Sequence, residues 1–184
     1  MKKTVWTFGL ISGAIVSIMM AATLPFHDEI GWTRGLIIGY TTMVLSFLLI
    51  YFGIRSYRDN VGGGTVRFGR AFAVGALIAI VASVCYVATW EVIYFNFIPD
   101  FMEKYSARSI EEVQKSGASP EVIEKKTAEI KRQTELYKNP FINMAMTFIE
   151  PLPVGLLIAI VSAGLLSRRK RGGALSMSST VASS

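Results

Sequence analysis

The stretch Arg55–Gly75, with the sequence RSYRDNVGGGTVRFGRAFAVG, lies between two long hydrophobic segments. It contains four arginines and a run of three glycines. Each flanking segment has the length of about 20 residues that a helix needs to cross the hydrocarbon core of a bilayer. Basic residues in the loops between membrane helices face the cytoplasm. This loop therefore predicts on which side of a membrane the rest of the chain lies.

The composition agrees with a membrane protein. Of the 184 residues, 52% are hydrophobic and only 17% are charged, whereas a soluble domain carries about a quarter charged residues. The mean hydropathy is +0.45, and the apolar residues form long runs. The net charge of +6 does not indicate nucleic acid, because many basic residues sit at the ends of hydrophobic runs. The one cysteine, Cys85, is expected to be a packing residue.

Working outward from the loop, four hydrophobic runs are long enough to be transmembrane helices. They cover about residues 5–26, 35–54, 71–98 and 141–167. The first run is longer than the hydrophobic part of a cleaved signal peptide, so we expect a retained helix. The sequence therefore predicts an all-α integral membrane bundle of four transmembrane helices over residues 1–171. The remainder, 172–184, is rich in glycine, serine and alanine and is predicted to be a disordered tail.

Small residues repeat every four positions in each predicted span, which favours close helix packing. The repeats are Gly9 and Gly13; Gly31, Gly35 and Gly39; Ala71, Gly75, Ala79 and Ser83; and Gly155, Ala159 and Ala163. Such faces pack helices within one bundle or against a second copy or a membrane partner. The sequence leaves these alternatives open.

Basic residues gather on one side of the predicted membrane. Ten lysines and arginines lie near membrane ends on this side, against one acidic residue, Asp59. They are Lys2, Lys3, Arg55, Arg58, Arg67, Arg70, Arg168, Arg169, Lys170 and Arg171. The positive-inside rule places this side, and with it both termini, in the cytoplasm of a bacterial inner membrane.

The segment between the third and fourth spans, residues 100–139, is predicted to be a small helical insertion outside the cytoplasm. It carries eight basic and eight acidic residues. Ser109 and Glu112 have the spacing of a capping box, which predicts the start of a short helix there. Gly117 is expected to end that helix, and Pro120 to begin a second one.

Glu91 and Glu150 are the ionisable residues that the spans place within the hydrocarbon. A charge at mid-bilayer costs at least ~2.5 kcal/mol, so such residues face a bundle interior or water. At ~1.5 Å per residue, Glu91 lies roughly 10 Å and Glu150 roughly 14 Å from the outer span ends. We hypothesise that they share a polar intramembrane site. The alternatives are separate structural roles as helix contacts, or a Glu150 that sits at the membrane surface.

Pro151 and Pro153 follow Glu150 directly. Proline lacks an N–H group, so these two free the carbonyls of Thr147 and Ile149. A carboxylate beside freed carbonyls is typical of the broken helices at transporter ion sites. A simple kink is the alternative explanation.

Four arginines near the central loop, Arg55, Arg58, Arg67 and Arg70, are candidate contacts for anionic lipid headgroups. Each would contribute about 1 kcal/mol near an anionic leaflet. Their role in setting the topology is by itself sufficient to explain them. The run 27–29, His-Asp-Glu, is expected to be a solvated loop and not a metal site. No residue set indicates catalysis, a metal or a cofactor.

The loop ends in a Gly-x-x-x-Phe-Gly-x-Ala-Phe pattern at residues 64–72, and the third span ends in Phe-Ile-Pro-Asp-Phe at 97–101. With four hydrophobic segments and a polar region before the last one, the chain resembles the uncharacterised bacterial membrane family DUF4199. The resemblance covers roughly residues 1–171. It implies an architecture and transfers no catalytic residue.

Together these features favour a non-enzymatic inner-membrane bundle with a structural or accessory role. A small transporter or channel-like protein that uses Glu91 and Glu150 is the first alternative. An accessory protein that binds anionic lipid is the second. The lipid bilayer itself is the partner that the sequence indicates most directly.

Overall fold

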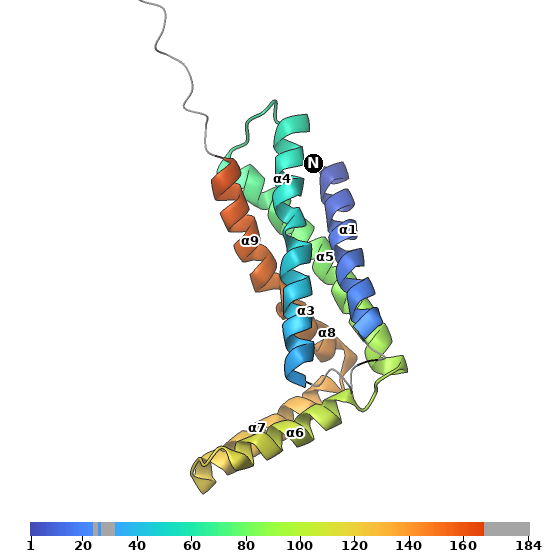
Figure 1. Ribbon diagram of the computed structural model, residues 1–184, viewed down its shortest axis with the longest axis vertical. Coiled ribbons are helices and arrows are strands. Elements are labelled where there is room, and N and C mark those ends of the chain that lie inside the picture. Colours follow the sequence, from blue (N-terminus) through green and yellow to red (C-terminus); the bar gives the residue numbers. More distant parts are fainter. Residues whose placement is uncertain (24–25, 27–31, 168–184) are drawn as a thin grey trace, which may run out of the picture.

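The computed structural model describes residues 1–23, 26 and 32–167, which form helices and no strand (Figure 1). The helices are α1 (Lys2–Thr23), α3 (Trp32–Phe47), α4 (Leu49–Asn60), α5 (Phe68–Asn96), α6 (Phe101–Lys115), α7 (Pro120–Tyr137), α8 (Pro140–Ile149) and α9 (Pro151–Leu166). The predicted all-α bundle is therefore confirmed. The predicted solvated loop at 27–29 and the predicted disordered tail at 172–184 lie outside the described residues.

Four helical stretches are long and apolar enough to span a membrane. They are Lys2–Thr23, Arg34–Asn60, Phe68–Asn96 and Pro140–Leu166. Two of them are interrupted, the second at Leu48 between α3 and α4, and the fourth at Glu150 between α8 and α9. The interruption at Glu150 is the one that the sequence Glu150-Pro151 predicts, because Pro151 cannot donate a backbone hydrogen bond.

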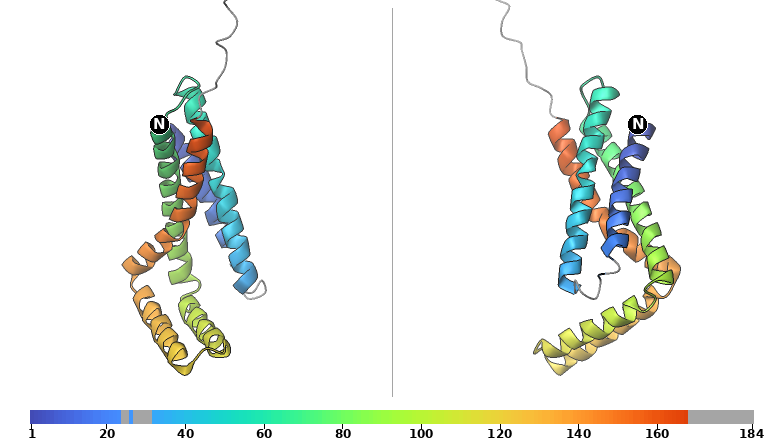
Figure 2. Two further views of the ribbon diagram at one scale, coloured as in Figure 1. Left: turned by 90° about the vertical axis from the view of Figure 1, so that its left-hand side faces the viewer. Right: turned by 45° about the vertical axis from the view of Figure 1, so that its right-hand side comes forward.

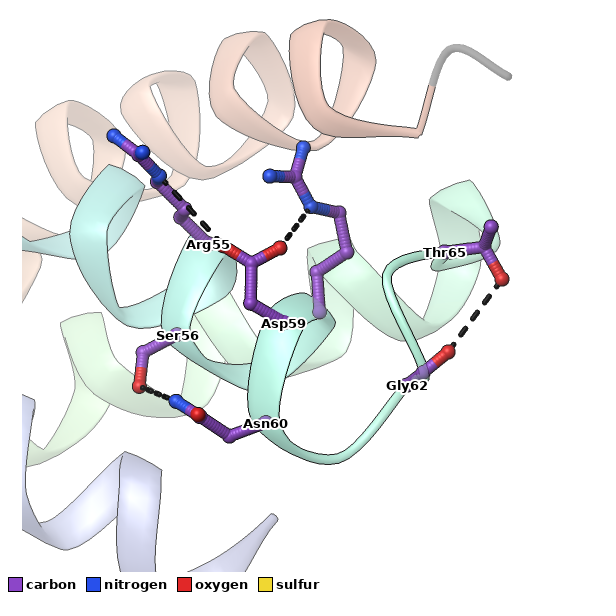
Figure 3. Close-up of polar contacts among 7 residues, drawn as sticks. Arg55, Ser56, Asp59, Asn60, Gly62 and Thr65 are labelled. Atoms are coloured by element: carbon purple, nitrogen blue, oxygen red, sulfur yellow. Dashed lines mark hydrogen bonds and ion pairs between the residues drawn. The ribbon is translucent and has the colours of Figure 1, made fainter. Parts of the chain in front are cut away.

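The second span runs beyond the predicted end at Ile54 and continues as helix α4 to Asn60. Side-chain contacts, two of them between residues one turn apart, accompany this extension of the helix (Figure 3). Asp59 accepts from Arg58 at 2.7 Å and pairs with Arg55 at 3.7 Å, while the Asn60 amide donates to the Ser56 hydroxyl. The charged residues that were expected to leave the helix therefore prolong it.

Helix α5 is the central element and packs against α1, α4, α8 and α9. Its neighbours approach it through small residues. A Cβ atom added at Gly13 would lie 2.5 Å from Cβ of Cys85, and one at Gly155 would lie 2.7 Å from Cβ of Ala79. Atoms cannot approach this closely, so no larger side chain fits at either glycine without a shift. These predicted small-residue faces serve packing inside the bundle.

The glycine seam predicted for the second span behaves differently. Among the described residues, no atom lies within 4 Å of the Cβ positions of Gly35 and Gly39. Both glycines are exposed on α3, so this part of the predicted seam is not packed within the chain. The third member, Gly31, lies outside the described residues.

The chain places unlike segments at the two ends of the bundle (Figure 1). The beginning of α1, the loop after α4 and the end of α9 meet at one end, which we call the basic end. Helices α6 and α7 lie side by side as a hairpin at the other, which we call the hairpin end. This hairpin projects sideways from the bundle (Figure 2). The arrangement agrees with the predicted separation of the basic segments from residues 100–139.

Helix α6 begins earlier than the capping-box pattern predicts. It starts at Phe101 and passes through Ser109 and Glu112 without interruption. Ion pairs between residues four apart hold this first part as helix, among them Lys104 with Asp100 at 2.8 Å. The capping-box prediction is thus wrong. Gly117 does follow the end of α6, with a φ of +72°, and Pro120 begins α7, as expected.

Candidate functional site

A cavity of about 400 Å³ lies at the hairpin end of the bundle. Helices α1 and α3 contribute one part of its wall, and α5, α6, α8 and the end of α7 contribute another. The lining residues are Val16, Met19, Met20, Thr23, Gly35, Leu36, Ile38, Gly39, Tyr40, Thr42, Met43, Tyr86, Trp90, Ile93, Ile98, Phe101, Met102, Tyr105, Tyr137, Thr147 and Glu150. The left view of Figure 2 shows α3 leaning away from α8 toward this end.

The cavity exists because α3 presents its smallest residues to it. Gly35 and Gly39 are one turn apart and carry no side chain to fill the space in front of them. Tyr40 and Met43 line the cavity from the same helix. The volume is in the range of small-molecule sites, which are typically about 300–1,000 Å³. The glycines predicted to form a packed seam therefore open a space instead.

Glu150 supplies the carboxylate of this cavity. It occupies the single non-helical position between α8 and α9, and the side chain is exposed. The Tyr86 hydroxyl of α5 donates a hydrogen bond to Glu150 Oε2 at 3.1 Å. Tyr40 of α3 is also close enough to interact electrostatically with this carboxylate. Two helices thus direct hydroxyl groups toward one acidic side chain.

A chain of hydrogen bonds runs behind the cavity wall and connects the hairpin to the bundle. Trp90 Nε1 donates to the Tyr137 hydroxyl at 2.8 Å, and Tyr137 and Thr147 hydroxyls are 3.1 Å apart. Thr147 donates to Oδ1 of the fully buried Asn143 at 3.1 Å. Since the Thr147 proton points to Asn143, Tyr137 must be the donor to Thr147. Burial raises the pKa of Tyr137, which keeps this donor protonated.

Glu91 does not join Glu150 in this cavity. The residues of α5 that line it are Tyr86, Trp90 and Ile93, which recur at helical spacing on one face. Glu91 follows Trp90 by one position, which turns its side chain about 100° away around the helix. Among the described residues, Glu91 Oε1 is buried without a hydrogen-bond partner. Glu91 is therefore not among the residues that line this cavity, and Tyr86 is the residue of α5 that contacts Glu150.

The two prolines after Glu150 lie in the first turn of α9. Pro151 is buried, whereas Pro153 is exposed. A proline at the beginning of a helix is tolerated because its missing N–H would have no partner there. The prolines therefore separate α8 from α9 and leave Glu150 at the junction.

The four arginines predicted as lipid contacts are at the basic end, away from the cavity. Arg55 and Arg58 share Asp59, which reduces their free positive charge (Figure 3). Arg67 and Arg70 are exposed on the other side of the glycine loop, where α5 begins. Because they lie apart from Asp59, Arg67 and Arg70 are better candidates for headgroup contacts than Arg55 and Arg58.

The sequence patterns did not indicate Tyr40, Tyr86 or Trp90 as site residues. Tyr86 and Trp90 are one turn apart on α5, which is a signal that a search for aromatic residues at helical spacing detects. Tyr40 carries no such signal, because its relation to Glu150 depends on how α3 packs. In the described residues, no group of three His, Cys, Asp or Glu side chains is arranged to hold a metal ion.

Comparison with known proteins identifies the family of this chain but indicates no activity. Residues 7–168 match the family described as "Protein of unknown function (DUF4199)". The curated proteins and the solved structures compared with the chain contain no match to it. The match covers most of the chain, including part of the first span, all of the other three spans and the residues of the cavity. This protein therefore belongs to the DUF4199 family.

Proposed function

We propose that this protein is a non-enzymatic multi-pass protein of the bacterial inner membrane whose cavity binds a small amphiphilic molecule. The observation that carries the proposal is the 400 Å³ cavity, which combines a mostly apolar wall with one carboxylate. Binding sites of this kind are concave, largely apolar and equipped with a few placed polar groups. The role would be accessory, as a receptor or carrier of the bound molecule.

The composition of the wall supports an amphiphile. Methionines from three helices line the cavity, and methionine adapts to irregular apolar shapes. They are Met19 and Met20 of α1, Met43 of α3 and Met102 of α6. Glu150, Tyr86 and Tyr40 provide a polar region to which a headgroup can bind. An apolar tail and a polar head would thus both find matching surroundings.

The proposed orientation places the cavity in the outer half of the membrane. The start of α1, the loop after α4 and the end of α9 share the basic end (Figure 1). Lysines and arginines near membrane helices are retained in the cytoplasm. With the basic end inside, the hairpin and the cavity beside it face the outer side, and both termini are cytoplasmic.

The test uses Trp90 as an internal reporter. The chain has three tryptophans, so the double variant Trp6→Phe, Trp32→Phe leaves Trp90 in the cavity wall as the only one. The full-length double variant, in lipid nanodiscs, is titrated with a ten-carbon alcohol brominated at its second carbon, next to the headgroup. Bromine quenches tryptophan fluorescence on contact, and we expect quenching that saturates.

Two glycine variants provide the controls. Gly39→Phe puts a ring into the cavity and should abolish the saturable quenching. Gly164→Phe makes the same change on α9, at a position that also has open space but does not line the cavity, and should leave quenching intact. Equal quenching in both variants would show that the probe acts from the bilayer and would reject the proposed site.

Transport is the second candidate, and the helix break at Glu150 is the observation that favours it. Broken helices with a carboxylate occur at the ion sites of transporters. In this structure Glu150 would act without Glu91, since Glu91 does not line the cavity. Cation uptake into liposomes that is lost in Glu150→Gln and kept in Glu91→Gln would support this candidate over simple binding.

A further inference from the structure

We propose that the headgroup bound in this cavity is a cation, so that the ligand is an alkylammonium-type amphiphile. The inference rests on the proposed function, because it specifies the ligand of the same cavity. It starts from the charge of Glu150, continues with the aromatic groups around it, and ends with the apolar part of the wall.

Glu150 has no cationic partner among the described residues. The ion pairs of that part of the chain lie at the basic end or in the hairpin segment, within residues 55–59, 100–115 and 135–138. The described groups that interact with the Glu150 carboxylate include the neutral hydroxyls of Tyr86, Tyr40 and Tyr137. A hydroxyl satisfies a lone pair of the carboxylate and leaves its charge uncompensated.

That charge lies well inside the fourth span. Glu150 is ten residues beyond Pro140, or about 15 Å along the helical path at ~1.5 Å per residue. A carboxylate at such depth is costly unless a positive charge or water accompanies it. A cationic headgroup would supply the missing charge, whereas a neutral or anionic one would not. The position of Glu150 therefore selects for a positive ligand.

Aromatic rings surround the same part of the cavity. Tyr40, Tyr86, Trp90 and Tyr137 line it from three helices, and Trp90 also contacts Phe101 edge to face, with ring centroids 5.1 Å apart. The faces of aromatic rings attract cations, and groups of them recognise alkylated ammonium ions. Carboxylate and rings together suit an alkylammonium better than a metal ion, which would require several oxygen ligands.

The remaining wall explains why the cation would carry an apolar chain. Val16 and Met19 of α1, Ile38 of α3 and Ile93 of α5 line the cavity without offering polar side-chain groups. A headgroup held at Glu150 has these residues within the same cavity for its tail. We infer an amphiphile with one positive charge and one alkyl chain.

The experiment compares probes that differ only in charge. The Trp90-only protein in nanodiscs of neutral lipid is titrated with decyltrimethylammonium, decanol and decyl sulfate, each brominated at the second carbon of the chain, next to the headgroup. Signal from the bilayer is removed by subtracting the quenching measured with Gly39→Phe. We expect the cation to bind about tenfold more tightly than the alcohol, which corresponds to ~1.4 kcal/mol, and the sulfate to bind most weakly.

Variants of Glu150 test whether this residue causes the preference for the cationic probe. Glu150→Gln should lose the tenfold preference for the cation over the alcohol, while Glu150→Asp should keep a preference. Glu129→Gln is the matched control, because it removes one acidic charge from the exposed surface of α7 and should change nothing. The folded state of each variant is checked by its helix content and its elution as a single species.

Three results would overturn the inference or its basis. Equal affinity for the cation and the alcohol would reject the cationic headgroup and leave the amphiphile-binding function in place. A cation preference that survives in Glu150→Gln would show that Glu150 is not the recognising group. Absence of saturable quenching by every probe would reject the proposed function as well as this inference.

Discussion

Ser12 of α1 and Ser46 of α3 exchange hydrogen bonds across the helix crossing. The Ser12 hydroxyl donates to the Ser46 carbonyl at 2.7 Å, and the Ser46 hydroxyl donates to the Ser12 carbonyl at 2.6 Å. Both residues are fully buried or nearly so. This reciprocal pair joins the two spans that carry one wall of the cavity, so it affects the shape of the candidate site.

The reciprocal pair predicts strong coupling between these positions. We expect Ser12→Ala and Ser46→Ala each to lower the unfolding free energy, and the double variant to lose less than the sum. Interhelical hydrogen bonds in membranes contribute about 0.6 kcal/mol on average and up to ~1.7 kcal/mol. Unfolding of the four proteins in mixed micelles measures the coupling. Strictly additive losses would mean that the two hydroxyls act independently.

Close packing of α9 on α5 predicts that a single methyl group destabilises the bundle. In Gly155→Ala the new Cβ would lie 2.7 Å from Cβ of Ala79, and overpacking of this kind costs about 1–3 kcal/mol. Gly164→Ala is the control on the same helix, because its Cβ position is open. Thermal melting in detergent should show a lower transition for the first variant only. A Gly155→Ala protein as stable as the control would contradict the packing.

The hydrogen-bond chain behind the cavity predicts that the Thr147 hydroxyl attaches the hairpin to the bundle. Thr147→Val removes the link between Tyr137 and Asn143 and leaves buried polar atoms unpaired, at a cost of about 1–3 kcal/mol. We expect faster hydrogen exchange in α7 of this variant, because the chain of hydrogen bonds holds the end of α7 against the bundle.

The control for this prediction is Thr134→Val in α7. The Thr134 hydroxyl donates to the Ile130 carbonyl of its own helix, so this hydrogen bond stays within α7. Its removal should leave the attachment of α7 unchanged. If hydrogen exchange in α7 is equally fast in both valine variants, the chain of hydrogen bonds does not anchor the hairpin.

Exposed ion pairs in α6 predict that the stability of the hairpin depends weakly on pH. Hydrogen bonds from Lys104 and Lys115 hold the pKa values of Asp100 and Glu111 below their usual range. A carboxyl with a lowered folded-state pKa stabilises the fold above its unfolded pKa of about 4, and this contribution is lost as the pH falls through the folded pKa. Both carboxyls are fully exposed, so the contribution is small.

We therefore expect the NMR signals of the α6 amides to be constant between about pH 8 and about pH 5 and to shift below about pH 4. The double variant Asp100→Asn, Glu111→Gln should show a smaller shift in the acidic range. Loss of helix in α6 already at neutral pH would contradict this account.

The proposed topology is tested with alkaline phosphatase, which becomes active only outside the cytoplasm. Fusion after Gly117, in the turn between α6 and α7, should give an active enzyme. Fusion after Gly173 should give an inactive one, because the C-terminus is proposed to be cytoplasmic. Full-length fusion protein must be present in both cases. The opposite pattern of activity would invert the bundle and place the cavity on the cytoplasmic side.

The sequence by itself determined the class of the protein. Uninterrupted apolar runs of membrane length require helices, because no other single segment satisfies its backbone hydrogen bonds in lipid. The same reasoning located the break at Glu150, since Pro151 lacks the donor that a continuous helix needs. Gly13 and Gly155 were recognised as packing positions because small residues at helical spacing permit close approach.

The tertiary structure alone decided which of these features form the candidate site. Gly35 and Gly39 follow the same spacing as the packed glycines, yet they face a cavity, because α3 leans away from α8 at the hairpin end. The sequence predicts similar depths for Glu91 and Glu150, but depth does not fix the direction of a side chain. The rotation of α5 about its axis brings Tyr86 to Glu150 and turns Glu91 away, and that rotation depends on packing against four other helices at once.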